Sequence, residues 1–95
     1  MKNFTETVEK NMEKLELYVP VVDRVHGGSH PEFHDVKRIY DGMVAKLESN
    51  KDADLNKEFE ELRKVTDNYK VPEDVCESYE AVYLMLAELD KSYDQ

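Results

Sequence analysis

Apolar residues recur along this chain at spacings of three and four, and the positions between them are mostly Glu, Lys and Asp. This spacing places each series on one face of an α-helix and leaves the charged residues on the other faces. No stretch alternates with period two for long enough to indicate a strand. The pattern therefore predicts four helices and no sheet. The four apolar series are Phe4, Val8, Met12, Leu15, Val19 and Val22; Phe33, Val36, Tyr40, Met43 and Leu47; Leu55, Phe59, Leu62, Val65 and Tyr69; and Val75, Tyr79, Val82, Leu86, Leu89 and Tyr93.

Glycine, proline and capping residues separate the second helix from the first. Gly27 and Gly28 cannot continue a helix without a cost in backbone entropy, so the first helix should end there. Ser29 and Glu32 then match the two partners of a capping box, and Pro31 suits the first helical turn. These signals predict helices over residues 3–26 and 30–49.

The third and fourth helices begin at acidic residues. Asp52 or Asp54 can cap the third helix, because a carboxylate there accepts a hydrogen bond from a free backbone N–H. Pro72, followed by Glu73 and Asp74, suits the first turn of the fourth. We expect these helices over residues 53–68 and 72–94. Since every connection is short, the chain should form one domain over residues 1–95, an all-α, antiparallel up-down-up-down four-helix bundle.

Composition narrows the range of partners and compartments. The 22 acidic and 13 basic residues give a formal net charge of −9, which argues against nucleic acid and anionic membranes as partners. The longest apolar run, residues 19–22, contains a proline and is far too short to span a bilayer. The first residues lack the apolar core of a signal peptide, and the single Cys76 cannot form an internal disulfide. We therefore expect a cytoplasmic protein.

The three histidines are the residues whose spacing allows a metal site. His26, His30 and His34 are each four positions apart, and histidines at i and i+4 on one helix can share an ion. The glycines interrupt the run, so His30 and His34 are the pair that can share a helix, with Glu32 nearby as a helper. The other interpretation is that His30 lies at the helix start and His34 faces solvent. His26 continues the first apolar series and should point inward as a neutral, hydrogen-bonded side chain or as a ligand.

Other reactive residues have structural interpretations. Cys76 lies near the expected start of the fourth helix, which favours a thiolate, but the acids beside it oppose one. With no neighbouring base evident in the sequence, we expect Cys76 to be a small buried apolar residue. The six tyrosines fall mostly on the apolar series and predict core packing. The chain has no Gly-rich phosphate loop, nucleophile elbow or Cys-x-x-Cys pair, so we predict that it is not an enzyme.

Two stretches resemble the hemerythrin-like domain of the iron–sulfur cluster repair di-iron proteins. They are residues 22–32, continuing through 36–37, and residues 62–76, continuing through Tyr79, Tyr83 and 88–89. The second is the more specific, because its Thr-Asp-Asn-Tyr…Pro-Glu-Asp…Cys pattern is not dictated by helical periodicity. The resemblance implies a four-helix bundle that holds two bridged irons through histidines and carboxylates, and a role in restoring damaged iron–sulfur clusters.

The ligands that the resemblance implies are mostly absent from this chain. The first-helix histidine of the family falls at about Thr5, and the second-helix histidine falls near Asn50. The companion glutamate falls near Asp54 and the third-helix histidine near Asp52, and at most one of these two alignments can hold. The family's last histidine and glutamate would follow Gln95. A di-iron site in such a bundle needs inward Glu-x-x-His pairs, so the usual centre is not expected here.

Two functions follow as hypotheses. The first is a ligand-depleted relative of the repair family, with no cofactor, that acts as a non-catalytic interaction or accessory protein by binding another protein or by self-association. The alternative is an iron- or zinc-binding protein that takes part in cluster repair or stress response. In that case His26, His30 and His34 would hold the metal, helped by Glu32, Asp52 and Asp54.

Overall fold

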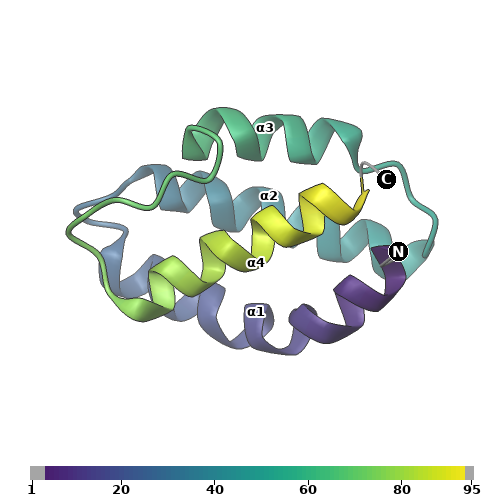
Figure 1. The fold of residues 1–95 in the computed structure, drawn as a ribbon, viewed down its shortest axis with the longest axis horizontal. Helices are drawn as coiled ribbons and strands as arrows, with labels where there is room; N and C mark the ends of the chain where they lie inside the picture. Colours follow the sequence, from purple (N-terminus) through teal and green to yellow (C-terminus); the bar gives the residue numbers. More distant parts are fainter. Residues whose placement is uncertain (1–3, 94–95) are drawn as a thin grey trace.

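The computed structural model describes residues 4–93, and within that range the chain has four helices and no strand (Figure 1). The helices are α1 (Phe4–His26), α2 (Glu32–Ser49), α3 (Asn56–Thr66) and α4 (Glu77–Tyr93). The all-helical prediction is confirmed. Within residues 4–93, no helix is both long and apolar enough to cross a lipid bilayer.

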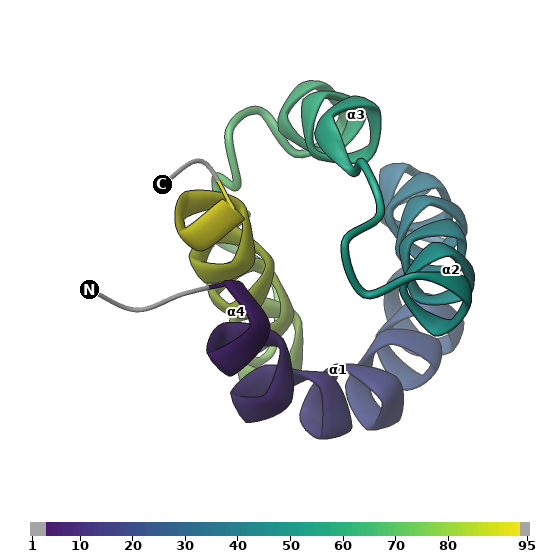
Figure 2. The same cartoon turned by 90° about the vertical axis from the view of Figure 1, so that its right-hand side faces the viewer.

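The four helices surround a common interior (Figure 2). α1 packs closely against both α4 and α2, and α3 packs closely against α2. The backbones of α3 and α4 approach each other less closely, and polar side chains link these two helices. The arrangement places the α1–α2 connection and the start of α4 at one end of the molecule, and the α2–α3 connection at the other (Figure 1).

The interior is filled by apolar side chains from all four helices and from Leu55, just before α3. All of them except Ile39 and Tyr83 belong to the predicted apolar series. Burying such side chains is the main term that stabilises a chain of this size. The buried apolar residues are Leu15, Val19, Val22, Phe33, Val36, Ile39, Tyr40, Met43, Leu55, Phe59, Leu62, Tyr79, Val82, Tyr83, Leu86 and Leu89.

The start of α2 differs from the prediction. The helix begins at Glu32, two residues later than expected, and Pro31 with helical backbone angles (φ −61°, ψ −21°) precedes it. No side chain caps this end, so the predicted capping box of Ser29 and Glu32 is wrong. The physical reason is a competing partner, because Glu32 Oε2 lies 3.0 Å from His30 Nδ1.

The starts of α3 and α4 also differ. α3 begins at Asn56, three residues later than expected, and Leu55 rather than Asp52 or Asp54 occupies its N-cap position, without a side-chain capping bond. Asp54 lies one residue earlier, and its Oδ1 accepts a hydrogen bond from the Asn56 backbone N–H at 3.0 Å. α4 begins at Glu77, five residues later than expected, so Pro72 does not open it. Asp74 instead contacts His30 across the end of the molecule, and this holds residues 72–76 outside the helix. Residues 3 and 94 of the predicted helices lie outside the described range.

α3 ends in a turn that forces three successive residues into the left-handed region. Asp67, Asn68 and Tyr69 have φ values of 54°, 61° and 64°. This conformation is unfavourable for residues with a Cβ, although Asn and Asp tolerate it best. Hydrogen bonds offset the cost, since the Asn68 N–H donates to Arg63 O at 2.8 Å and the Tyr69 N–H donates to Thr66 Oγ1 at 2.8 Å. α3 therefore stops at Thr66, two residues earlier than predicted.

Candidate functional site

All three histidines and the cysteine lie at the end of the molecule where α1 ends and α2 and α4 begin (Figure 1). His26 is the last residue of α1, His30 lies in the α1–α2 connection, and His34 is in the first turn of α2. Cys76 directly precedes α4. These four side chains do not form one cluster, because each histidine has its own partners.

His30 is held between two carboxylates on opposite sides of its ring. Its Nδ1 lies 3.0 Å from Glu32 Oε2, and its Nε2 lies 3.1 Å from Asp74 Oδ1. The ring also meets Tyr79 edge-on, with 5.5 Å between the ring centroids. His30 therefore joins the start of α2 to the segment before α4. Burial lowers the pKa of His30, but the hydrogen bond and charge of Glu32 and the charge of Asp74 outweigh it, and the net pKa is raised above 6.5.

This environment predicts a pH-dependent stability. A pKa raised by folding means that the histidine stabilises the folded state fully below its unfolded pKa, near 6.5, and loses this effect as the pH rises through the folded pKa. We expect the unmodified protein to exceed a His30→Gln variant in stability most at about pH 6 and least at about pH 9. Urea unfolding of both proteins at the two pH values measures the difference. An equal difference at both pH values would contradict the assignment.

His34 pairs with α1 rather than with His30. Its Nδ1 lies 2.6 Å from Asp23 Oδ1, although the two groups do not have the alignment of a hydrogen bond. Gly27 allows this approach, because a Cβ at that position would lie 2.8 Å from His34 Nε2. The prediction that His30 and His34 share one helix is wrong, since α2 begins two residues after His30.

His26 and Cys76 are the pair of side chains at this end of the molecule whose contact is best suited to a chemical reaction. His26 Nε2 lies 3.1 Å from Cys76 Sγ, and the two residues are 50 positions apart in the sequence. The His26 ring is half-buried and meets Tyr79 edge-on at 5.5 Å, which fixes its orientation. Cys76 is exposed, so the prediction of a small buried apolar residue is wrong. The reason is the late start of α4, which leaves Cys76 in the connection before the helix and not on a helix face that packs inward.

Tyr79 and Tyr83 form the inner wall behind this end of the molecule. Both are buried, and their hydroxyl oxygens are 3.1 Å apart. Burial, followed by the hydrogen bond to Tyr83 and the charge of Glu32, raises the pKa of Tyr79 well above its ordinary value. Burial likewise raises the pKa of Tyr83. Both phenols are therefore neutral over the physiological pH range and act as packing and hydrogen-bonding groups.

Among residues 4–93, no group of three or more His, Cys, Asp or Glu side chains is arranged to hold a metal ion. The two carboxylates beside His30 contact opposite ring nitrogens, so the three groups do not converge on one point. Asp52 and Asp54 lie at the other end of the molecule in the α2–α3 connection, where both are exposed. There Asp54 Oδ1 accepts a hydrogen bond from the Asn56 backbone N–H, and the Asp52 backbone N–H donates to Asn50 Oδ1 at 3.0 Å. The structure thus separates Asp52 and Asp54 from the histidines, and within residues 4–93 no three of the predicted metal residues converge on one point.

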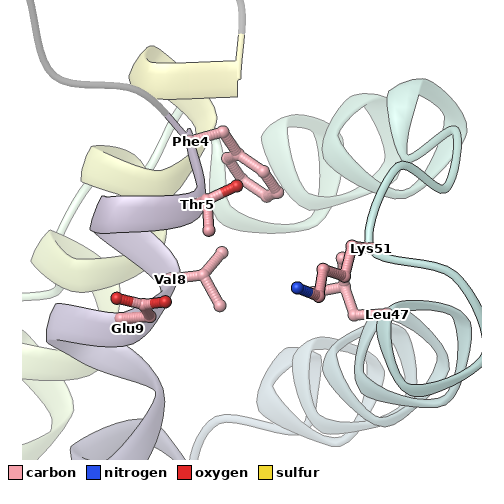
Figure 3. Close-up of a pocket in the computed structure, with 6 residues that line it drawn as sticks. All are labelled: Phe4, Thr5, Val8, Glu9, Leu47 and Lys51. Carbon is pink, nitrogen blue, oxygen red and sulfur yellow. The ribbon is translucent and has the colours of Figure 1, made fainter.

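A small pocket opens at the end opposite the histidines (Figure 3). Its volume is about 190 Å³, and it is lined by Phe4, Thr5, Val8 and Glu9 of α1, Leu47 of α2, and Lys51 of the following connection. Figure 3 shows Phe4, Thr5 and Val8 of α1 on one side of the opening and Leu47 and Lys51 on the other. The lining is mainly apolar, with one carboxylate and one ammonium group. Thr5 is the position where the family resemblance would place a first-helix histidine.

The His26–Cys76 contact is the feature that the sequence interpretation missed. A useful signal was present, because His26 lies at the end of one apolar series and Cys76 near the start of another. In a bundle these ends can meet.

Comparisons of the chain with family models, with curated proteins and with solved structures found no match.

Proposed function

We propose that the protein is a non-catalytic interaction or accessory protein. In this proposal it is a small acidic cytoplasmic bundle with the antiparallel, hemerythrin-like architecture of the cluster-repair family, but without that family's iron ligands. Three of the positions where the resemblance would place ligands, Thr5, Asn50 and Asp54, are exposed. The pocket that Thr5 lines holds one carboxylate, Glu9, and one ammonium group, Lys51, so it lacks the several carboxylates and histidines that a di-iron site needs. Both observations support a function on the surface.

The observation that carries the proposal is an apolar stripe on the outer face of α1. Leu17, Val21 and Val25 recur every four residues, so they lie along one side of the helix. They are 64%, 38% and 62% exposed, whereas the residues that α1 turns inward are buried. Contiguous exposed apolar area is a feature of contact surfaces, and our proposal assigns that role to this stripe.

The spacing of this stripe fits a second copy of the same chain. In an antiparallel pair of α1 helices related by a two-fold axis at Val21, Leu17 of each copy lies against Val25 of the other. The contact is therefore self-complementary. Its area is small compared with the roughly 1,200 Å² of a stable interface, so we expect a weak dimer. The net charge of −9 on each copy opposes association, and salt should strengthen the contact by screening this repulsion.

Sedimentation equilibrium over a wide range of protein concentration tests the proposal. We expect a dimer with a dissociation constant of about 10⁻⁴ M, strengthened severalfold when salt shortens the screening length from about 10 Å at 0.1 M to about 3 Å at 1 M. The double variant Leu17→Glu/Val25→Glu should remain monomeric. Leu84→Glu is the matched control, because Leu84 is 60% exposed but lies on α4. It should dimerise like the unmodified protein.

Three outcomes would contradict the proposed surface. A monomer at every concentration and salt level would exclude self-association. An equal loss of dimer in the Leu84→Glu control would place the contact elsewhere. A dimer that survives in Leu17→Glu/Val25→Glu would exclude the α1 stripe. Far-ultraviolet circular dichroism of each variant establishes that the helices remain folded.

The alternative function, an iron or zinc site on His26, His30 or His34, has weaker support. The structure pairs His30 and His34 with separate carboxylates and His26 with a thiol, rather than grouping them. Elemental analysis of untagged protein, before and after anaerobic Fe(II) loading, distinguishes the two functions. Iron or zinc bound in a ratio near one per chain, and lost in a His30→Ala/His34→Ala variant, would favour the metal site and count against our proposal.

A further inference from the structure

The contact between Cys76 and His26 places a nucleophile next to a base on the surface of the molecule. A thiol attacks through its sulfur once the proton is removed, and an adjacent imidazole is the usual acceptor of that proton. The 3.1 Å separation of Sγ and Nε2 is within reach of a direct proton transfer. The edge-on contact with buried Tyr79 holds the ring in place from behind.

The Cys76 thiol lines a hollow whose other polar side chains are negatively charged. The hollow has a volume of about 330 Å³ and is lined by Cys76 with Val71, Pro72, Val75 and three glutamates, Glu73, Glu77 and Glu80. All three glutamates are exposed. The lining contains no Lys or Arg. A reagent that approaches Cys76 therefore meets a local negative potential, to which the net charge of −9 adds.

We propose that Cys76 is a reactive thiol, activated by His26, that exchanges with small cationic disulfides in preference to anionic ones. The Cys76 proton passes to His26 Nε2, and Sγ attacks one sulfur of the disulfide R–S–S–R. The new bond joins Sγ to that sulfur as the S–S bond of the reagent breaks. The leaving thiolate RS⁻ takes the proton from His26. The products are a mixed disulfide on Cys76 and one molecule of RSH, so the exchange needs no other oxidant or reductant.

The experiment compares cystamine, which carries two ammonium groups, with glutathione disulfide, which is anionic. Intact-mass spectrometry follows formation of the mixed disulfide, and each rate is divided by the rate of the same reagent with 2-mercaptoethanol. We expect the normalised rate for cystamine to exceed that for glutathione disulfide about tenfold at low salt, and the ratio to fall towards one at 1 M salt. Cys76→Ser should form no adduct.

Two further variants distinguish the effect of the His26 base from the effect of the glutamate charges. His26→Gln should slow both reagents about tenfold and leave their ratio unchanged, because it removes the base and not the glutamates. Glu77→Gln/Glu80→Gln should lower the ratio and keep the proximity of His26 to the thiol. A His26→Gln protein that reacts at the unmodified rate would overturn the role of His26. Equal normalised rates for the two reagents at low salt would overturn the charge selection. The α1 stripe is not involved, so dimerisation neither supports nor contradicts this inference.

Discussion

Replacing Asp90 with alanine is expected to lower the free energy of unfolding by about 2 kcal/mol, because it breaks a partly buried hydrogen-bond and charge network. Asp90 is 6% exposed. Its carboxylate accepts two hydrogen bonds from Arg63, each at 2.8 Å, and a third from the Tyr69 hydroxyl at 2.7 Å. This group joins α3 and the turn after it to α4, where the two helices lack close backbone packing.

The same carboxylate supports the left-handed turn at the end of α3. Tyr69 is the third successive residue with a positive φ, and its hydroxyl group bonds to Asp90. Loss of that bond removes one of the contacts that offset the strain of the turn. The Asp90→Ala variant should therefore loosen the chain around residues 67–70 as well as weaken the α3–α4 contact. Hydrogen exchange of these amides measures the local effect.

Urea unfolding tests the prediction against two variants. Asp90→Asn keeps the shape and one acceptor oxygen, so it should lose less stability than Asp90→Ala. Lys64→Ala is the control on α3, because it removes an exposed ion pair with Glu60 at 3.9 Å. Exposed pairs of this kind contribute about 0.5 kcal/mol or less. An Asp90→Ala protein as stable as Lys64→Ala would show that the network does not hold α3 to α4.

The apolar periodicity was sufficient to predict the helices and most of the core. Leu15, Val19 and Val22 repeat with the helical period and are buried, as this pattern requires. The periodicity did not reveal the second apolar series on α1, in which Leu17 and Val25 face outward. These residues are interleaved with the core residues, and only the packing of α1 against its neighbours shows which of the two series is buried.

The errors at the starts of α2 and α4 have one physical cause. Local signals such as Ser29-x-x-Glu32 and Pro72 indicate where a helix can begin, but partners distant in sequence decide whether it does. His30 binds both Glu32 and Asp74, which draws Glu32 away from a capping role and holds Asp74 outside α4. That network joins residues more than 40 positions apart. It follows from tertiary packing, and no spacing rule along the chain contains it.

The sequence identified the three histidines of the candidate site, but it did not identify Cys76 or the partner of each ring. The four-residue spacing of His26, His30 and His34 indicated a shared metal, whereas the folded chain gives each ring its own partner. The decisive fact for His26 is that Cys76 lies at the same end of the molecule. Knowledge of which helix ends meet would have found this pair, and that depends on the path of the whole chain.

Gly27→Ala is expected to destabilise the fold by about 2–3 kcal/mol through steric overlap. Gly27 is buried at the end of α1, and its N–H donates to Asp23 O at 2.9 Å. A Cβ at this position would overlap that same carbonyl oxygen and the His34 ring. The carbonyl belongs to the backbone of α1, so the clash cannot be relieved by turning a side chain. The α1–α2 connection would have to open, and the contact between His34 and Asp23 would be strained.

Gly28→Ala provides a matched control for this prediction, since the two glycines are adjacent and share the same connection. Gly28 is exposed, and a Cβ there would have no heavy atom within 4 Å. Its replacement should change the free energy of unfolding by less than about 0.5 kcal/mol. Thermal and urea unfolding of both variants measure the contrast. If the two variants were equally stable, the close approach of α2 to α1 would not depend on the absence of a side chain at Gly27. A large loss in the free energy of unfolding that occurs only in Gly27→Ala would show that the position of His34 depends on the absence of a side chain at residue 27.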